Sequence, residues 1–185
     1  MKNNIILIGM PGAGKSTIGV VLAKKLGYEF IDSDLVIQNT YKKVLQELIN
    51  EHGTEGFEQI ENDVNKSINT TSSVIATGGS AIYGHEAMEH FDSIGTIVYL
   101  NLPYEEIEQR LGNLEERGVT IKKGQTLKDL YNERTPLYKK YIIGEYWESH
   151  RVASNHRTTP TASELKKAQL FASKYADVKE APKPW

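Results

Sequence analysis

The chain has 185 residues, 39% of them hydrophobic and 25% charged, which suits one globular domain with a sizeable core. Its formal net charge of −2 argues against a general attraction to nucleic acid or to an anionic membrane, and no apolar run approaches the roughly 18 residues of a membrane helix. The absence of cysteine excludes disulfides and thiolate metal sites, and the five histidines lack the spacing of a helical zinc site.

The N-terminal stretch combines a short apolar run at residues 5–8 with a glycine-rich turn at residues 9–17. Apolar residues then recur at helical spacing over residues 18–26, so the turn joins a buried strand to a helix. In that context the turn has the pattern of a P-loop, because its backbone N–H groups and the helix dipole together form a cradle for polyphosphate. The alternative is a glycine-rich turn that precedes Lys-Ser by chance.

The P-loop pattern assigns nucleotide contacts to a continuous set of residues: Gly12, Ala13, Gly14, Lys15, Ser16 and Thr17. Lys15 would reach the outer phosphates of the nucleotide, and the hydroxyl of Ser16 would bind Mg²⁺. Mg²⁺ is the only metal that the sequence implies.

Residues 28–34 are predicted to form a second strand, which ends in two acids. A period of two places Asp32 and Asp34 on one face, at the sheet edge where open α/β proteins bind their ligands. The alternative is that Asp34 only caps a helix that starts at Leu35.

A helical pattern over residues 35–69 is interrupted at Gly53 and Gly56, and it is too long for a plain connection. We expect it to form a functional flap. A buried strand at residues 73–76 then leads to Gly78 and Gly79, where the absence of side chains would allow a ligand to approach closely. A tight turn without a ligand is the alternative.

Residues 96–100 are predicted to form a fourth strand, and Pro103 opens the next helix. Residues 112–124 contain three glycines, mixed charges and only scattered apolar residues, a composition typical of a mobile lid. This segment contains Arg117.

A helical stripe over residues 127–141 places Arg134 on the inward-facing side. Such a cation either meets an anion or extends to solvent along an apolar surface. Pro136 is expected to kink this helix. Residues 150–154 form a weak last strand, and a final helix follows Ser163.

The alternation of strands and helices predicts an α/β protein, with a parallel sheet covered by helices on both faces. We assign residues 1–176 to a single domain and residues 177–185 to a C-terminal tail.

Over roughly residues 4–175 the chain resembles the shikimate kinase family in the order and spacing of its motifs: Gly9-x-x-Gly12-x-Gly14-Lys15-Ser16-Thr17, Asp32-Ser33-Asp34, Thr77-Gly78-Gly79, Arg117 and Arg134-x-Pro136-x-Tyr138. The resemblance implies a P-loop three-layer sandwich with a five-stranded parallel sheet. It also implies a substrate-binding flap at about residues 35–70 and a lid at about residues 112–124.

For the ATP half of the site, the resemblance implies that Lys15 contacts the phosphates, that Ser16 binds Mg²⁺ and that Asp32 holds Mg²⁺ through water. Arg110 would lie against adenine, and Arg117 would move in with the lid over the transferring phosphoryl group. Phosphoryl transfer needs alignment and charge neutralisation, which these groups supply.

For the acceptor half, the resemblance implies that Asp34 holds the reacting hydroxyl. Gly78 and Gly79 would approach the acceptor ring, and Arg134 would pair with the acceptor's carboxylate.

The chain also departs from the family pattern. The family reads Phe-Arg-x-x-Glu in the flap, and that arginine is a second ligand of the shikimate carboxylate, whereas this chain reads Phe57-Glu58-Gln59-Ile60-Glu61. Glu58 therefore places an anion where the family has a cation. Ser80 replaces the family's third glycine, and Gly118 replaces the proline after the lid arginine.

The sequence thus indicates a Mg-ATP-dependent kinase of a small hydroxylated acceptor, with shikimate as the acceptor that the resemblance implies. One alternative is a related kinase with a gluconate-like or polyol acceptor. Another is a nucleotide-binding regulator without catalysis, although such a sensor has no need of Asp34 or Arg117. We expect a cytoplasmic monomer without a nucleic-acid or membrane partner.

Overall fold

The structure, a computed structural model, describes residues 3–111 and 124–141. In these residues four parallel strands form one sheet in the order β2-β3-β1-β4. The strands are β1 (Asn4–Ile8), β2 (Glu29–Asp32), β3 (Ser73–Ala76) and β4 (Gly95–Tyr99). The predicted five-stranded sheet is thus seen with four strands, because the expected strand at residues 150–154 lies outside the described residues.

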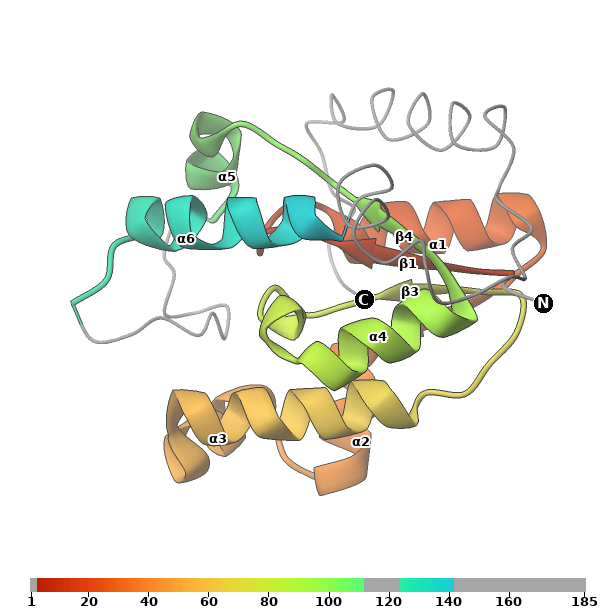
Figure 1. Ribbon diagram of the computed structural model, residues 1–185, viewed down its shortest axis with the longest axis horizontal. Helices are drawn as coiled ribbons and strands as arrows, with labels where there is room; N and C mark the ends of the chain where they lie inside the picture. The colour runs from red at the N-terminus through yellow and green to blue at the C-terminus, as the bar shows by residue number, and fades with distance from the viewer. Residues whose placement is uncertain (1–2, 112–123, 142–185) are drawn as a thin grey trace, which may run out of the picture.

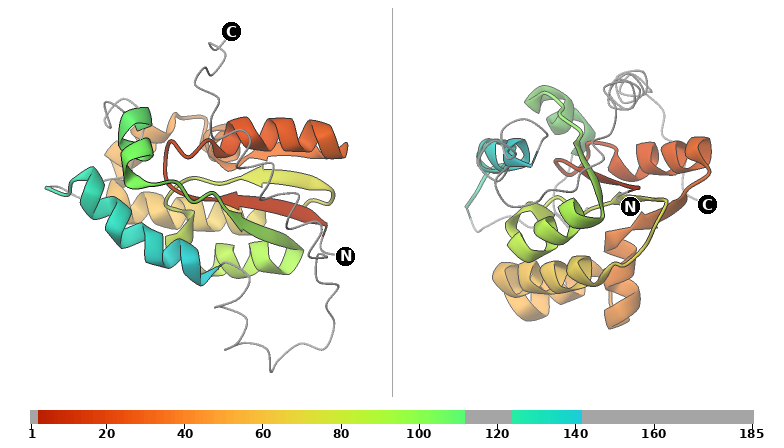
Figure 2. Two further views of the ribbon diagram at one scale, coloured as in Figure 1. Left: turned by 90° about the horizontal axis from the view of Figure 1, so that it is seen from above. Right: turned by 45° about the vertical axis from the view of Figure 1, so that its right-hand side comes forward.

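Six α-helices and one 3₁₀-helix accompany the sheet in the described part of the chain: α1 (Lys15–Leu26), α2 (Ser33–Tyr41), α3 (Leu45–Ser67), η1 (Ala81–Tyr83), α4 (His85–Ile94), α5 (Tyr104–Leu111) and α6 (Leu127–Lys140). Helix α1 covers one face of the sheet, and α4 covers the other with α3 behind it (Figure 1). Helices α5 and α6 lie toward the end of the sheet where the strands finish (Figures 1 and 2). None of these helices is long and apolar enough to cross a bilayer.

The core follows from the alternation of side chains along β1. Ile6 and Ile8 are buried on the face that also holds Phe91 of α4, whereas Leu7 is buried against Leu22 of α1. Strand β1 is therefore apolar on both faces, as expected for a central strand of a sheet between two helical layers.

The predicted flap has a small core of its own, which α2 and α3 build together. Its buried side chains are Ile37, Leu48, Phe57, Ile60 and Val64. Helix α3 contains one break, at Gly53, where φ is 69° and ψ is −179°. The predicted interruption at Gly53 is confirmed, whereas Gly56 is helical and does not interrupt α3.

Two further expectations concern helix boundaries. Helix α6 continues through Pro136 as a single helix, and the kink expected at this proline stays a prediction. Helix α2 begins at Ser33 rather than at Leu35, and its N-cap is Asp32, whose side chain accepts a hydrogen bond from the backbone N–H of Asp34 at 3.1 Å. Asp34 therefore does not cap the helix, and it does not lie on a strand.

Candidate active site

The turn between β1 and α1 has the backbone of a phosphate-binding loop. Gly14 is the N-cap of α1 and has a φ of 88°, a left-handed conformation that glycine adopts without strain. The loop thus delivers the N-terminus of a twelve-residue helix to the end of the sheet. That arrangement favours the binding of an anion at the loop.

Lys15 lies inside this loop, with its side chain buried. Its Nζ donates hydrogen bonds to the carbonyl oxygens of Gly9 at 2.8 Å and of Met10 at 3.0 Å. Burial lowers the pKa of Lys15 to about 8, while the nearby carboxylate of Asp34 opposes this shift. An ammonium group has three donors, so one remains for an incoming phosphate oxygen.

Ser16 and Asp32 lie together, as predicted. The Ser16 hydroxyl donates to Oδ2 of Asp32 at 2.7 Å. The described residues contain no cluster of three or more histidine, cysteine or acidic side chains that would hold a metal alone. One hydroxyl and one carboxylate suit Mg²⁺, which takes few protein ligands and completes its shell with water and phosphate oxygens.

Asp34 lies in the first turn of α2. The preceding residue, Ser33, contacts the loop that follows β3. The Ser33 hydroxyl accepts a hydrogen bond from the backbone N–H of Gly78 at 3.3 Å, which holds α2 against that loop. Burial raises the pKa of Asp34 to about 6, and the charge of Asp32 adds to the shift while Lys15 opposes it. The group is therefore poised to take up a proton near neutral pH.

Gly78 and Gly79 make room for functional side chains. A Cβ atom at Gly78 would clash with Oε1 of Glu61 and lie 2.9 Å from Oδ1 of Asp34. At Gly79 it would clash with Pro11 and lie 3.1 Å from Nη1 of Arg134. Neither glycine has a positive φ, so the close approach of these protein side chains, and not the backbone conformation, favours glycine here. The approach of a ligand to this pair stays a prediction.

Glu61, for which the sequence predicted no role, is also a member of this site. Its side chain is 1% exposed, and neither carboxyl oxygen makes a well-formed hydrogen bond, although the Ser80 hydroxyl is near enough to stabilise the charged form. Burial raises the pKa of Glu61 to about 7, and the charges of Asp34 and Glu58 act in the same direction.

Arg134 is 1% exposed, so the idea that it extends to solvent is wrong. Its guanidinium lies 5.3 Å from the ring centroid of Tyr83. One turn further along α6, the hydroxyl of Tyr138 donates to the carbonyl oxygen of Gly79 at 2.6 Å. Helix α6 is thereby tied to the loop after β3, and Arg134 lies over that loop.

Arg110 is on α5, close to the phosphate-binding loop. A Cβ atom at Gly14 would lie 3.9 Å from its Nη1, and its Nη2 donates to Oε2 of Glu106 at 3.2 Å. The position next to the loop is compatible with the predicted contact to adenine. Arg117 and most of the predicted lid, residues 112–123, lie outside the described residues.

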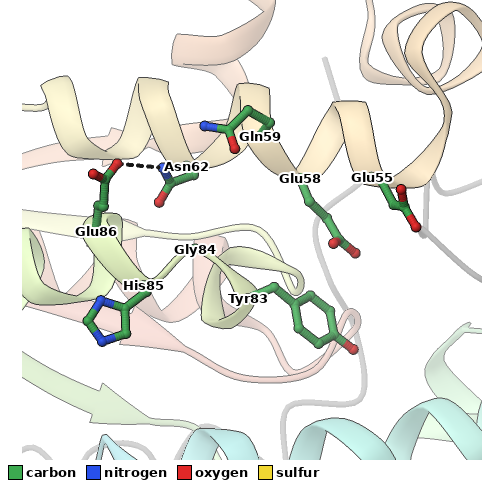
Figure 3. A pocket seen from close by; sticks show the side chains of 8 residues that line it. All are labelled: Glu55, Glu58, Gln59, Asn62, Tyr83, Gly84, His85 and Glu86. Carbon is green, nitrogen blue, oxygen red and sulfur yellow. Dashed lines mark hydrogen bonds between the residues drawn. The ribbon is translucent and has the colours of Figure 1, made fainter.

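Glu58 is partly buried on α3 and lines a hollow of about 520 Å³ between α3 and the start of α4 (Figure 3). The hollow is lined by Glu55, Glu58, Gln59, Asn62, Tyr83, Gly84, His85 and Glu86. Three of these side chains are acidic. The charge of Glu58 reaches the buried site, because it contributes to the raised pKa of Glu61.

Comparison with known proteins agrees with this geometry. The family profile described as shikimate kinase matches residues 11–169. The chain belongs to the shikimate kinase family.

Individual relatives cover most of the chain. A shikimate kinase from a Nostoc species is 36% identical over 174 residues, covering 92% of this chain and 91% of the relative. One from Nostoc punctiforme is 41% identical over 141 residues, covering 74% of this chain and 77% of the relative. The solved structure of the Acinetobacter baumannii shikimate kinase in complex with shikimate has a TM-score of 0.70, 30% identity and 96% coverage of each chain.

Membership of this family makes the protein an ATP-dependent phosphotransferase with an alcohol acceptor, built on the α/β P-loop kinase fold.

Proposed function

We propose that this protein transfers the γ-phosphoryl group of ATP to a hydroxyl group of shikimate. The observation that carries the proposal is the convergence of Asp34, Glu61 and Arg134 on Gly78 and Gly79, next to Lys15 of the phosphate-binding loop. One end of this site offers a base, and the other offers a buried cation. An acceptor with both a hydroxyl and a carboxylate matches these two groups.

In the ATP half, the loop amides and Lys15 would bind the β- and γ-phosphates. Ser16 and Asp32, which already contact each other, would hold Mg²⁺, which neutralises charge on the phosphates during transfer. Arg110 would lie along adenine from its position beside the loop.

In the acceptor half, Asp34 would accept a hydrogen bond from the reacting hydroxyl and take up its proton as the phosphoryl group is transferred. Its raised pKa of about 6 supports this role, because a base works best when its pKa lies near the working pH. Arg134 would bind the carboxylate. A buried guanidinium forms strong, oriented hydrogen bonds with a carboxylate.

A second acceptor class is favoured by one specific observation, the acidic lining next to the acceptor half. Glu58 lies beside this half, and its charge acts on Glu61. A carboxylate acceptor is repelled by such groups, whereas the hydroxyls of a neutral polyol would donate hydrogen bonds to them. A gluconate-like acceptor carries the same carboxylate penalty as shikimate.

The remaining expectations are proposals as well. Arg117 would enter with a lid at residues 112–124 and stabilise the transferring phosphoryl group. We further propose a monomeric, cytoplasmic enzyme without nucleic-acid or membrane partners. A purely regulatory, non-catalytic role does not account for the convergence of Asp34 and Arg134 beside the phosphate loop.

Coupled ADP release, measured over shikimate, other hydroxylated acids, neutral polyols and nucleosides, tests the proposal. Mass spectrometry of the product should show one added phosphoryl group on shikimate. ADP release that requires a polyol and does not respond to shikimate would instead support the second acceptor class. ATP binding without ADP release for any member of the panel would support the regulator.

A further inference from the structure

The guanidinium of Arg134 is contacted by a tyrosine from a different element. Tyr83, the last residue of η1, accepts a hydrogen bond from Nε of Arg134 at 3.3 Å through its hydroxyl oxygen. At the other end of the guanidinium, Nη1 faces Gly79 closely enough that a Cβ atom there would lie 3.1 Å away. The Nε edge is thus turned toward Tyr83, and a terminal nitrogen is turned toward the acceptor half of the site.

The hydroxyl of Tyr83 is itself held by a short series of hydrogen bonds that includes Glu133 of α6 and Gln125, which lies just before this helix. It donates to Oε1 of Glu133 at 2.6 Å, and Oε2 of Glu133 accepts from Nε2 of Gln125 at 2.6 Å. A hydroxyl has one proton, so donation to Glu133 leaves its lone pairs for Arg134. Burial raises the pKa of Tyr83 to about 12, so the hydroxyl keeps this proton at neutral pH.

The ring of Tyr83 adds a second contact, because the guanidinium lies 5.3 Å from its centroid. Figure 3 shows Tyr83 on η1 and Glu58 on α3 extending to the same side of the hollow between these elements. Tyr83 therefore lies between the carboxylate-binding arginine and the acidic hollow. None of the roles assigned above to the transfer reaction includes this residue.

A carboxylate is bound best when a guanidinium already presents its fork in the right plane. An arginine side chain has several rotatable bonds, and ordering them at the moment of binding lowers the affinity for the ligand. A hydrogen bond on Nε and an aromatic face beside the guanidinium order the side chain before the acceptor arrives.

We infer that Tyr83 is a positioning residue for acceptor binding, which acts by orienting Arg134 so that its terminal nitrogens face the carboxylate of the acceptor. The inference rests on the proposed function, because it takes Arg134 as the ligand of that carboxylate. Tyr83 acts through its contact with Arg134, so we expect its effect in the binding of the acceptor and not in the chemical step.

The test compares Tyr83→Phe with the wild-type enzyme in steady-state kinetics with shikimate. Phenylalanine keeps the ring beside Arg134 and removes only the hydroxyl. We expect the KM for shikimate to rise about three- to tenfold, the effect of one lost hydrogen bond, with kcat and the KM for ATP unchanged. Tyr104→Phe is the matched control, because the Tyr104 hydroxyl also donates to a glutamate, Glu108, at 2.6 Å on α5; it should leave all three constants unchanged.

Two variants of Glu133 test the same hydrogen bonds from the acceptor of the Tyr83 hydroxyl. Glu133→Gln keeps an acceptor oxygen for Tyr83 and should leave the KM for shikimate close to the wild-type value. Glu133→Ala removes the acceptor and should raise this KM, and it also replaces Tyr83→Phe as the test if that variant fails to fold.

The outcomes separate the inference from the proposed function. If the wild-type enzyme turns over shikimate and neither Tyr83→Phe nor Glu133→Ala changes its KM, the inference is wrong and the proposed function stands. A fall in kcat with an unchanged KM also overturns it, because that result places Tyr83 in the chemical step. If the wild-type enzyme does not turn over shikimate at all, the proposed function fails, and the inference fails with it.

Discussion

Glu61 should carry a proton in the folded protein under conditions where an unfolded chain has lost it. Its pKa rises from 4.5 to about 7 on folding, so between these pH values the folded state binds one proton more than the unfolded state. Stability therefore falls as pH rises through this window. Glu61→Gln, which is neutral at every pH, should raise the free energy of unfolding at pH 8 by roughly 1–3 kcal/mol relative to wild type.

Chemical denaturation at pH 4 and at pH 8 measures this difference, which should nearly vanish at pH 4, below both pKa values. Glu55→Gln, an exposed change on the same helix, serves as the control and should show no such pH dependence. An equal effect of Glu61→Gln at both pH values would mean that Glu61 is not protonated on folding.

Asp34 and Lys15 should give the free enzyme a bell-shaped pH profile. Asp34 must be ionised to accept a proton, so kcat/KM should fall as pH drops below about 6; Lys15 must be protonated, so kcat/KM should fall as pH rises above about 8. Asp34→Asn should remove the acidic limb and lower kcat by about 100-fold or more. Loss of ATP affinity in this variant, with kcat retained, would instead place Asp34 in the metal site.

Glu58 should weaken the binding of any acceptor that carries a carboxylate. At about 5 Å and an effective dielectric near 20, the repulsion between two such charges is roughly 3 kcal/mol, an upper limit for a side chain that is partly solvated. Glu58→Arg should therefore lower the KM for shikimate by about tenfold with little change in kcat. Glu55→Arg makes the same change of charge in the same hollow and should have a much smaller effect. An unchanged KM in Glu58→Arg would remove Glu58 from acceptor selection.

At the level of elements, the break in α3 decides how the flap packs against the rest of the domain. Gly53 has a φ of 69° and a ψ of −179°, a region that only glycine occupies readily. Gly53→Ala should lower the free energy of unfolding by about 1–3 kcal/mol, because a Cβ atom strains this backbone even though nothing lies within 4 Å of it. Glu55→Ala, at an exposed helical position, is the control. Equal stability of Gly53→Ala and wild type would show that the break is not required.

Across the whole molecule, the apolar patterns predicted most strands and helices, whereas the contacts between side chains were not predicted. Apolar runs bounded by turn residues gave the four strands to within a few residues, and the helical stripe placed Arg134 inside. The start of α2 was missed because the cap from Asp32 is a side-chain contact that strand alternation does not reveal.

Tyr83 escaped prediction for a related reason. It lies in a three-residue helix too short to show periodicity, and its partners Glu133 and Arg134 are 50 and 51 residues away in the chain. Glu61 was not predicted as a site residue, because its convergence with Asp34 on Gly78 depends on how three separate segments pack. The family resemblance supplied roles for other site residues. It gave no information on the contact between Tyr83 and Arg134 or on the approach of Glu61 to Asp34.

The most direct test of this account is ADP release by the wild-type protein and by Lys15→Ala, with ATP, Mg²⁺ and shikimate, each component omitted in turn. The account predicts that wild type releases ADP only when all three are present. It also predicts that Lys15→Ala, shown by circular dichroism to be folded, releases none, since Lys15 acts on the phosphates of ATP. Normal ADP release by a folded Lys15→Ala protein, or wild-type release that ignores shikimate, would contradict the account.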